Sequence, residues 1–283
     1  MPIPFSWQAE QFDELLRSVR RDEVAPYILR HLDPRGPTLE AGCGLGRFVA
    51  FMEHHGFREV RGVDVSHDAV AIVNRLAPHL DVTFGDVSSL PFEDSSMRGI
   101  VSLGVVEHFP EGPGPALREL TRVMMPGATA IVTVPYLNLV RRLKRSLRVD
   151  ALGARLRGGR PARTGEVVAR SVAELGERQE EPAEALRFVT WPATGPFFEY
   201  RFRAGEMRAE LEAAGLSVLD VAPLDTVSGM FYELGRPFVR SSQQDRTATR
   251  AGRAFERLFS RATWVHAHML LFVARKPEAD GPA

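Results

Sequence analysis

Cysteine is nearly absent from this chain of 283 residues, which contains a single one, Cys43. A lone cysteine excludes an intramolecular disulfide and a metal site built from several thiolates, and it fits a reducing compartment. Long apolar runs are missing too, because no stretch approaches the roughly 18 to 20 apolar residues that cross a membrane. The opening residues, MPIPFSWQAEQFDELL, do not have the basic-then-apolar layout of a secretion signal. We therefore expect a cytoplasmic protein without integral membrane segments.

An excess of charge of either sign is also missing. Lys and Arg number 36, and so do Asp and Glu. Without a net field, the chain as a whole has no electrostatic attraction for nucleic acid or for anionic lipid. A motif of the Asn-Pro-Pro-Tyr kind does not occur either, so we expect no nucleic-acid partner.

What the chain does have is enough apolar sequence, 44%, for the core of one large domain. From residue 38 onward, short apolar runs alternate with helical patterns as far as ATAIVTVP, which ends at Pro135. This rhythm predicts an α/β fold with a doubly wound, mostly parallel sheet. Ahead of it, the apolar positions in residues 6–32 have helical spacing.

The rhythm stops after Pro135 and resumes late in the chain. Residues 151–185 are rich in Gly, Arg, Glu and Ala, whereas GEMRAELEAAG and LSVLDVA predict a helix and a strand. Residues 268–276, HMLLFVARK, predict a last buried strand. We expect an N-terminal helical cover (1–35), a core (36–136), a variable cap (137–200), and a C-terminal part of the sheet (201–283) with a helical insertion at 228–263.

The stretch TLEAGCGLGRFVAFM, residues 38–52, places three glycines two apart behind Glu40. A glycine-rich turn between a strand and a helix lets the backbone approach a ligand closely. The dinucleotide fingerprint fails here because Arg47 stands where its third glycine belongs. The Gly-Lys-Ser or Gly-Lys-Thr ending of a phosphate loop is missing as well.

The pattern Glu-x-Gly-x-Gly-x-Gly resembles the first motif of the class I S-adenosylmethionine-dependent methyltransferases of the small-molecule type. Asp64 in VRGVDVS and Asp86 in VTFGDVSSLPF follow at the family's spacing. GIVSLGVVEHF and ALRELTRVMMPGATAIVTVP resemble its next segments, so the likeness covers about residues 36–136 and, less closely, 202–224 and 268–276. It implies a Rossmann-like seven-stranded sheet with the last strand antiparallel, N-terminal helices over the site and a helical cap.

The resemblance also implies cofactor positions for S-adenosylmethionine and its product S-adenosylhomocysteine. Glu40 would help to hold the ammonium group, Asp64 the ribose hydroxyls and Asp86 the adenine edge. The full set of expected cofactor residues is Glu40, Gly42, Cys43, Gly44, Gly46, Asp64, Val65, Asp86, Val87 and Leu103. Cys43 fits there as a small residue in a crowded turn, since no group that would activate its thiolate can be named from the sequence. Nothing in the sequence requires a metal.

Three residues are candidates for a general base or for positioning the acceptor: His108, Tyr136 and Tyr200. Each has a competing structural interpretation. His108 could simply begin a helix, and the two tyrosines could belong to aromatic core packing.

The expected function is methyl transfer to a small or medium-sized organic acceptor, with oxygen or nitrogen slightly ahead of carbon. One alternative is a non-catalytic cofactor-binding or interaction protein on the same fold. Another is a methyltransferase for membrane-bound quinone or lipid precursors, suggested by the basic stretch LNLVRRLKRSLRV at 137–149. Peripheral membrane contact, an anionic acceptor and a solvated lid helix are the interpretations open for that stretch.

Overall fold

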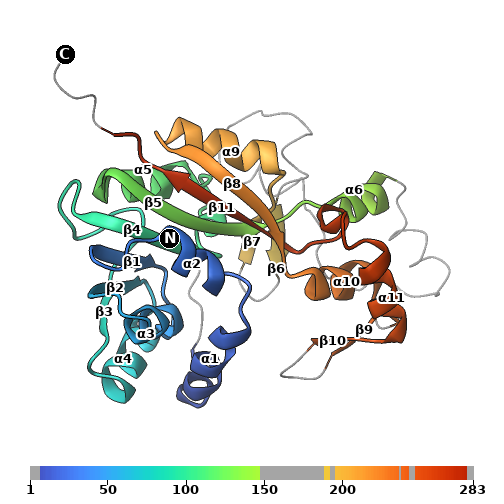
Figure 1. The fold of residues 1–283 in the computed structure, drawn as a ribbon, viewed down its shortest axis with the longest axis horizontal. Coiled ribbons are helices and arrows are strands. Elements are labelled where there is room, and N and C mark those ends of the chain that lie inside the picture. The colour runs from blue at the N-terminus through green and yellow to red at the C-terminus, as the bar shows by residue number, and fades with distance from the viewer. Residues whose placement is uncertain (1–6, 147–187, 192–194, 236, 242–245, 279–283) are drawn as a thin grey trace. The chain divides into compact units, whose positions relative to one another are not determined.

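A seven-stranded sheet with the strand order β3-β2-β1-β4-β5-β11-β8 forms the centre of the fold (Figure 1). Parallel pairs join β1 to β2 and β4, β2 to β3, and β4 to β5. β11 runs antiparallel to β5, because Gly127 near the start of β5 bonds to Lys276 after β11, while Tyr136 after β5 bonds to His268 before β11. The predicted seven-stranded sheet with an antiparallel last strand is confirmed. Its strands are β1 (Pro37–Ala41), β2 (Glu59–Asp64), β3 (Asp81–Phe84), β4 (Met97–Leu103), β5 (Met124–Pro135), β8 (Ser217–Leu224) and β11 (Met269–Arg275).

The structure is a computed structural model that describes residues 7–146, 188–191, 195–235, 237–241 and 246–278. The chain divides into two compact units. The first comprises Met1–Val134, Gly205–Ala222 and Leu271–Ala283, and the second comprises Pro135–Ala204 and Pro223–Leu270.

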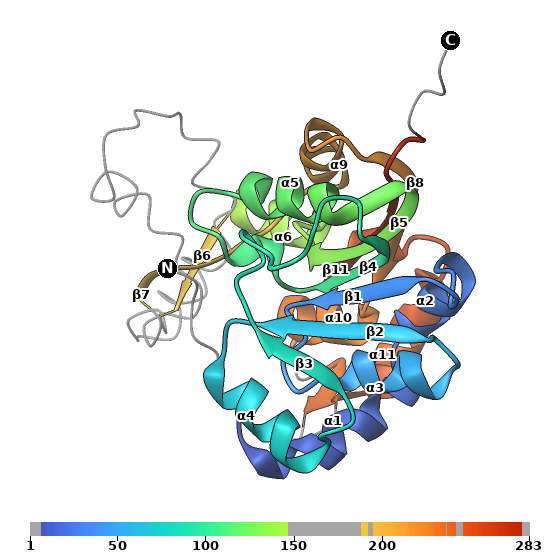
Figure 2. The ribbon, with the colours of Figure 1, turned by 90° about the vertical axis from the view of Figure 1, so that its left-hand side faces the viewer.

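The first unit holds most of the sheet, with helices packed on it (Figure 2). α3 packs on β2, and α4 packs on both β2 and β3. α3 buries Phe48, Val49 and Met52, because Met52 lies three and four positions after the other two and residues at these spacings share one face of a helix. The helices of this unit that follow a strand are α3 (Arg47–His54), α4 (His67–Leu76), α5 (Gly114–Val123) and α9 (Ala204–Ala213).

The N-terminal cover consists of η1 (Ala9–Gln11), α1 (Phe12–Ser18), η2 (Val19–Arg21) and α2 (Ala25–His31). Pro26 lies in the first turn of α2, where its missing N–H leaves no helical bond unmade. Arg47, the first residue of α3, forms an ion pair with Asp22 at 2.9 Å and donates to Ser18 Oγ at 3.2 Å. These contacts attach the cover to the helix that follows the glycine turn.

The second unit contains more strand than the sequence predicted. Between 137 and 200 the described residues form α6 (Leu139–Ser146) and an antiparallel hairpin of β6 (Phe188–Trp191) and β7 (Gly195–Tyr200). Residues 147–187 lie outside the described residues, so the helical cap is not confirmed. The insertion at 228–263 holds α10 (Thr226–Leu234), α11 (Arg250–Leu258) and a second hairpin of β9 (Val239–Ser241) and β10 (Arg246–Ala248). The expected helical insertion thus also contains a hairpin, whose strands of three residues are too short to show an alternating pattern in the sequence.

Candidate functional site

Three glycines follow the carboxyl end of β1 with positive φ angles, which are +80° at Gly42, +53° at Gly44 and +70° at Gly46. Glycine adopts this region without the Cβ clash that other residues meet. The turn is held on β2, since the carbonyl of Val63 accepts from the amides of Gly42 at 2.7 Å and Cys43 at 3.0 Å. The backbone of the turn is therefore fixed at the edge where β1 and β2 end.

Asp64 closes this turn from the end of β2. Its Oδ2 accepts a hydrogen bond from the amide of Gly44 at 2.7 Å, and its Oδ1 accepts from the amide of Ser66 at 2.8 Å. Burial raises the pKa of Asp64, and the two hydrogen bonds act in the opposite direction. Each carboxylate oxygen has two lone pairs, so both oxygens can still accept from a ligand. Two neighbouring hydroxyl groups of a ligand could each donate a hydrogen bond to one of these two carboxylate oxygens.

Glu40 lies inside the fold at the end of β1, with 3% of its surface exposed. Its Oε2 accepts from the amide of Val49 in α3 at 2.9 Å. Burial raises the pKa of Glu40 to about 8, although the charge of Arg47 and the Val49 hydrogen bond act against the rise. A buried carboxyl group of this kind becomes ionised more readily when a cation arrives beside it.

Asp86 follows β3 and organises the loop in which it lies. Its Oδ1 accepts from both the amide and the hydroxyl of Ser88, at 2.8 and 2.7 Å. The next side chain, Val87, is buried. Asp86 thus stabilises a turn, and the second oxygen of its carboxylate is the acceptor predicted to face the adenine amino group.

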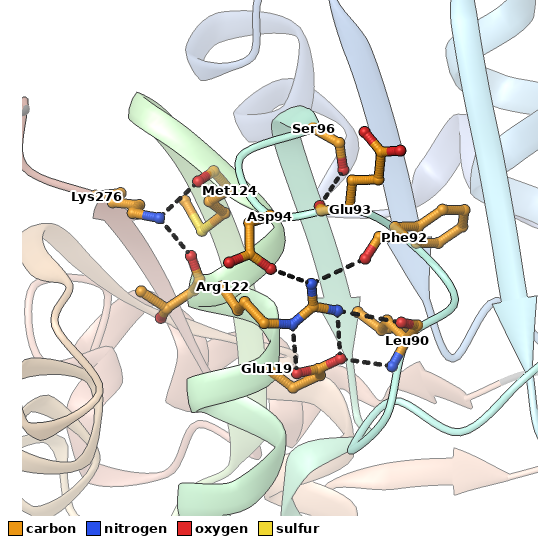
Figure 3. A network of polar contacts seen from close by, with 10 residues as sticks. Leu90, Phe92, Glu93, Asp94, Ser96, Glu119, Arg122, Met124 and Lys276 are labelled. Atoms are coloured by element: carbon orange, nitrogen blue, oxygen red, sulfur yellow. Dashed lines mark hydrogen bonds and ion pairs between the residues drawn. The ribbon is translucent and has the colours of Figure 1, made fainter.

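Arg122 of α5 anchors the same loop, as Figure 3 shows. Its Nη2 donates to the carbonyl of Leu90 at 3.1 Å, and its Nη1 donates to the carbonyl of Phe92 at 2.9 Å and to Asp94 at 2.6 Å. Glu119 accepts from Arg122 at 2.7 and 2.9 Å and also from the amide of Leu90 at 2.7 Å. The loop is therefore tied to the helix by both partners of one ion pair.

Two further contacts stabilise this junction between α5 and β5. The amides of Ser95 and Ser96 donate to the carbonyls of Arg122 and Val123, at 3.0 and 2.9 Å. Lys276 caps the end of α5, where its Nζ donates to the carbonyls of Thr121 and Met124 at 2.9 and 2.7 Å (Figure 3). A cation at a helix C-terminus also interacts favourably with the helix dipole.

At the end of β4, Leu103 is half-buried, and the turn continues through Gly104 with φ +69°. Val105 lies where a Cβ on Gly42 would overlap it, so the turns after β1 and β4 are in close contact. His108 ends the short helix η3 (Val106–His108), and its Nε2 lies 4.0 Å from Glu107 Oε1. The helical turn that the competing interpretation expected is present, and a catalytic role for His108 remains a prediction.

The cofactor residues expected from the sequence thus lie at the carboxyl ends of four neighbouring parallel strands, β3, β2, β1 and β4. Trp7 is a contact that sequence reasoning missed. A Cβ built on Gly44 would lie 2.7 Å from Trp7 Cζ2, so the indole ring packs directly on the glycine turn. The sequence shows only that a tryptophan precedes the first helix. It does not indicate which segment the indole ring will contact.

Tyr136 and Tyr200 belong to the second unit. Tyr136 donates its amide to the carbonyl of His268 at 2.8 Å, and its ring meets Trp264 edge-on with centroids 6.1 Å apart. Burial raises the pKa of Tyr136. The ring of Tyr200 lies 6.2 Å from that of Phe202. Both tyrosines therefore have aromatic neighbours, and their catalytic assignment stays a prediction.

The helix α6 is oriented differently from a simple amphipathic lid. Arg141 is buried, and its guanidinium bonds to Glu233, to the carbonyl of Tyr136 and to Nδ1 of His268. Leu139 and Leu143, by contrast, are 41% and 51% exposed. Arg141 is buried because Glu233 provides it with a buried partner, which helical periodicity alone could not reveal.

The described residues contain neither a candidate metal site nor a candidate membrane-spanning helix. Within them, His, Cys, Asp and Glu side chains form no group of three or more that could hold a metal ion. In the same part of the chain, no helix has both the length and the apolar character needed to cross a membrane.

Comparison with known proteins gives matches to the same region. The sequence model of the methyltransferase domain family matches residues 39–132, from β1 to β5. A Mycolicibacterium smegmatis protein named "Probable S-adenosylmethionine-dependent methyltransferase" is 34% identical over 116 residues, which cover 41% of this chain and 44% of that protein. The chain thus spans less than half the length of this relative and of two further curated relatives from Mycobacterium tuberculosis.

Solved structures share the fold over most of their length. An S-adenosylmethionine-dependent methyltransferase from Mesorhizobium loti has a TM-score of 0.56 at 17% identity, covering 91% of this chain and 99% of its own. The geranyl diphosphate C-methyltransferase of Streptomyces coelicolor, solved with S-adenosyl-L-homocysteine, has a TM-score of 0.54 at 16% identity, covering 97% and 90%. Together with the strand order, these findings show that the chain contains a methyltransferase domain at residues 39–132 and has the fold of the class I S-adenosylmethionine-dependent methyltransferases.

Proposed function

We propose that this chain transfers the methyl group of S-adenosylmethionine to a small or medium-sized organic acceptor, with oxygen or nitrogen slightly ahead of carbon. The observation that carries the proposal is the set of acidic side chains at successive strand ends, Glu40, Asp64 and Asp86, around the glycine turn. The smegmatis relative and the structural relatives named above are consistent with it.

The residues present fit the groups of this cofactor. The buried Glu40 carboxyl suits its ammonium group, and the two oxygens of Asp64 suit the ribose diol. Asp86 and Val87 would take the adenine edge, the turn from Gly42 to Gly46 the amino-acid part, and Leu103 the sulfonium end. The absence of Cβ atoms in the turn allows close backbone approach.

The cofactor supplies an activated methyl group that departs from sulfur in an in-line displacement. The protein's own task is to align the acceptor atom with that methyl group and to keep water away. A base is needed only where the acceptor arrives protonated. His108, Tyr136 and Tyr200 are the candidates for that role, and Trp7, which packs on Gly44, is a candidate for excluding water.

Calorimetry with S-adenosylmethionine and S-adenosylhomocysteine tests the binding part. Asp64→Ala should weaken cofactor affinity by about 1 to 3 kcal/mol, as expected for lost charged hydrogen bonds. Asp68→Ala is the matched control, since Asp68 is an exposed acid in the first turn of α4. Absence of cofactor binding to the wild type would overturn the proposal, and an Asp64→Ala affinity equal to that of the control would show that the ribose is misplaced.

Turnover is tested separately, by release of S-adenosylhomocysteine with a panel of hydroxyl, amine and carbon acceptors. Cofactor binding without turnover on any acceptor would favour the alternative of a non-catalytic cofactor-binding protein.

A second candidate function is methylation of a lipid or quinone precursor. One structural relative is named a geranyl diphosphate C-methyltransferase, which is a carbon methyltransferase for an isoprenoid diphosphate. Within this chain, the exposed Leu139 and Leu143 of the basic helix α6 are the features that favour an apolar acceptor or surface. Turnover on isoprenoid acceptors and none on hydrophilic ones would favour this candidate.

A further inference from the structure

Charge is divided unequally between the two units, although the chain as a whole is neutral. The described residues of the second unit contain twelve Lys or Arg and four Asp or Glu. Those of the first unit contain fifteen Lys or Arg and twenty-three Asp or Glu. The described part of the second unit therefore has a strong excess of positive charge, although the whole sequence has a net charge of zero.

The helix α11 concentrates this positive charge on one face. Arg250, Arg253 and Arg257 are all exposed, and their spacing of three and four residues places them along one side of the helix. The opposite side faces the unit, where Gly252 is buried and Phe255 packs against the ring of Phe238 with centroids 5.7 Å apart. The three arginines thus form the outward face of α11, called here the arginine face.

The acid nearest in sequence to the arginine face is Glu256, which is half-buried on the same helix. Among the described residues, no ion pair joins any of its three arginines to an Asp or Glu, and Arg253 donates instead to the carbonyl of Ala248 at 2.7 Å. Arg261, three residues after the helix ends, is exposed as well. An unneutralised row of cations of this kind attracts an extended anionic surface.

Exposed apolar side chains accompany the cations. Leu258, next to Arg257 at the end of α11, is 78% exposed, and Trp264 of η5 (Thr263–Val265) is 38% exposed. η5 in turn contacts α6, which carries the exposed Leu139 and Leu143. The phosphates of a nucleic acid offer leucine no apolar contact, whereas the headgroup region of a bilayer accepts leucine and tryptophan beside arginine.

We propose that the second unit docks on an anionic lipid surface through the arginine face of α11, with Leu258 entering the headgroup region. Each arginine brought near a surface of anionic lipid contributes about fivefold in binding constant. The docking requires no membrane-spanning segment and does not depend on methyl transfer.

The test is co-sedimentation of the full chain with vesicles of phosphatidylcholine alone and of phosphatidylcholine mixed with phosphatidylglycerol. Binding should require the anionic lipid and should weaken as salt is raised, because screening shortens the range of the attraction. The variant Arg250→Gln/Arg253→Gln/Arg257→Gln should bind on the order of 100-fold more weakly. Leu258→Ser should weaken binding severalfold at unchanged charge.

The matched control neutralises three exposed arginines of the first unit, Arg58, Arg75 and Arg118, and should leave vesicle binding unchanged. Circular dichroism of each variant verifies that its fold is kept. Absence of binding to the mixed vesicles, equal binding to neutral vesicles, or equal loss in both triple variants would overturn the proposal. Binding to duplex DNA or RNA that requires the arginine face, without vesicle binding, would assign the surface to nucleic acid instead.

Discussion

Replacing Glu40 by Gln should make the protein more stable at neutral pH, although the substituted residue lies in the candidate site. Glu40 is buried, and its Oε2 accepts from the amide of Val49 at 2.9 Å. A glutamine has nearly the shape of a protonated glutamic acid, and its carbonyl oxygen can accept the same hydrogen bond. The variant therefore preserves this contact, removes the ability to ionise and replaces the one O–H donor of the acid by an NH2 group.

The magnitude follows from the pKa of Glu40, which burial raises from 4.5 to about 8. Between these values the unfolded chain releases the proton and the folded protein keeps it, so a rise in pH favours unfolding. The free energy of unfolding then falls by about 1.4 kcal/mol for each pH unit. By pH 7 this amounts to a loss of about 3 kcal/mol relative to pH 4.5, and the loss ends above pH 8, where both states are ionised.

Denaturant unfolding of wild type and Glu40→Gln at pH 5, 6, 7 and 8 measures the effect as a difference between two proteins. Other titrating groups contribute equally to both and cancel. The difference should be small at pH 5 and should grow to about 3 kcal/mol in favour of the variant at pH 7. Glu111→Gln, a change at an exposed glutamate, serves as control and should show no such growth.

A pH-independent difference between wild type and Glu40→Gln would refute the reasoning, because the carboxyl group would then be ionised in the folded protein throughout. On the proposed function, the same variant should bind S-adenosylmethionine more weakly, since it cannot become anionic beside the ammonium group. In the wild type, cofactor binding below pH 8 should release a proton, which calorimetry in buffers of different ionisation enthalpy detects. Greater stability and weaker binding in one variant would show that the buried carboxyl group is kept for the ligand.

Three further substitutions test contacts of both units. Gly44→Ala should destabilise the protein by about 1 to 2 kcal/mol in thermal unfolding, because alanine is strained at φ +53°, and it should also change the fluorescence of Trp7, which the new Cβ would meet. Arg122→Met should raise the dissociation constant for S-adenosylmethionine on the order of tenfold, since it releases the loop after β3. Arg141→Met should destabilise the fold by about 3 to 5 kcal/mol in denaturant unfolding, because the buried Glu233 loses its guanidinium, and Arg141→Met/Glu233→Met should recover most of the loss.

Each of these three has a matched comparison. Gly56 has φ +84° with nothing within 4 Å of a built Cβ, so Gly56→Ala carries the backbone strain alone, and equal losses at both glycines would show that Trp7 contributes nothing. Arg118 is exposed on the same helix as Arg122, and an equal effect of Arg118→Met on cofactor affinity would contradict the anchoring role. A double variant at Arg141 and Glu233 as unstable as the single one would mean that packing, and not charge, dominates there.

The predictions that held were those that depend on local patterns. The alternation of short apolar runs and helical segments predicted the parallel part of the sheet. The apolar residues in each segment lie on the side of the strand or helix that is buried, so the pattern can be read segment by segment. The residues around the glycine turn could be placed at one edge from spacing alone, since parallel strands joined by helices all end on the same side of a sheet. The order of Glu40, Asp64 and Asp86 along the chain was therefore enough to predict that they lie at successive strand ends.

The hairpins β6–β7 and β9–β10 were not predicted. Each of their short strands depends on the strand that it pairs with as much as on its own residues. Arg141 in α6 shows the same limit. Its partner Glu233 lies 92 residues away, so a local helical pattern could not predict that Arg141 is buried.

By itself, then, the sequence determined which segments are strands or helices in the core and which acids stand at their ends, because these properties depend on neighbours a few residues away. The tertiary structure alone decided that Trp7 packs on Gly44, that Arg122 holds the loop after β3 and that the arginine face of α11 points outward. These features depend on the path of the whole chain, which brings distant residues into contact and which no local period encodes.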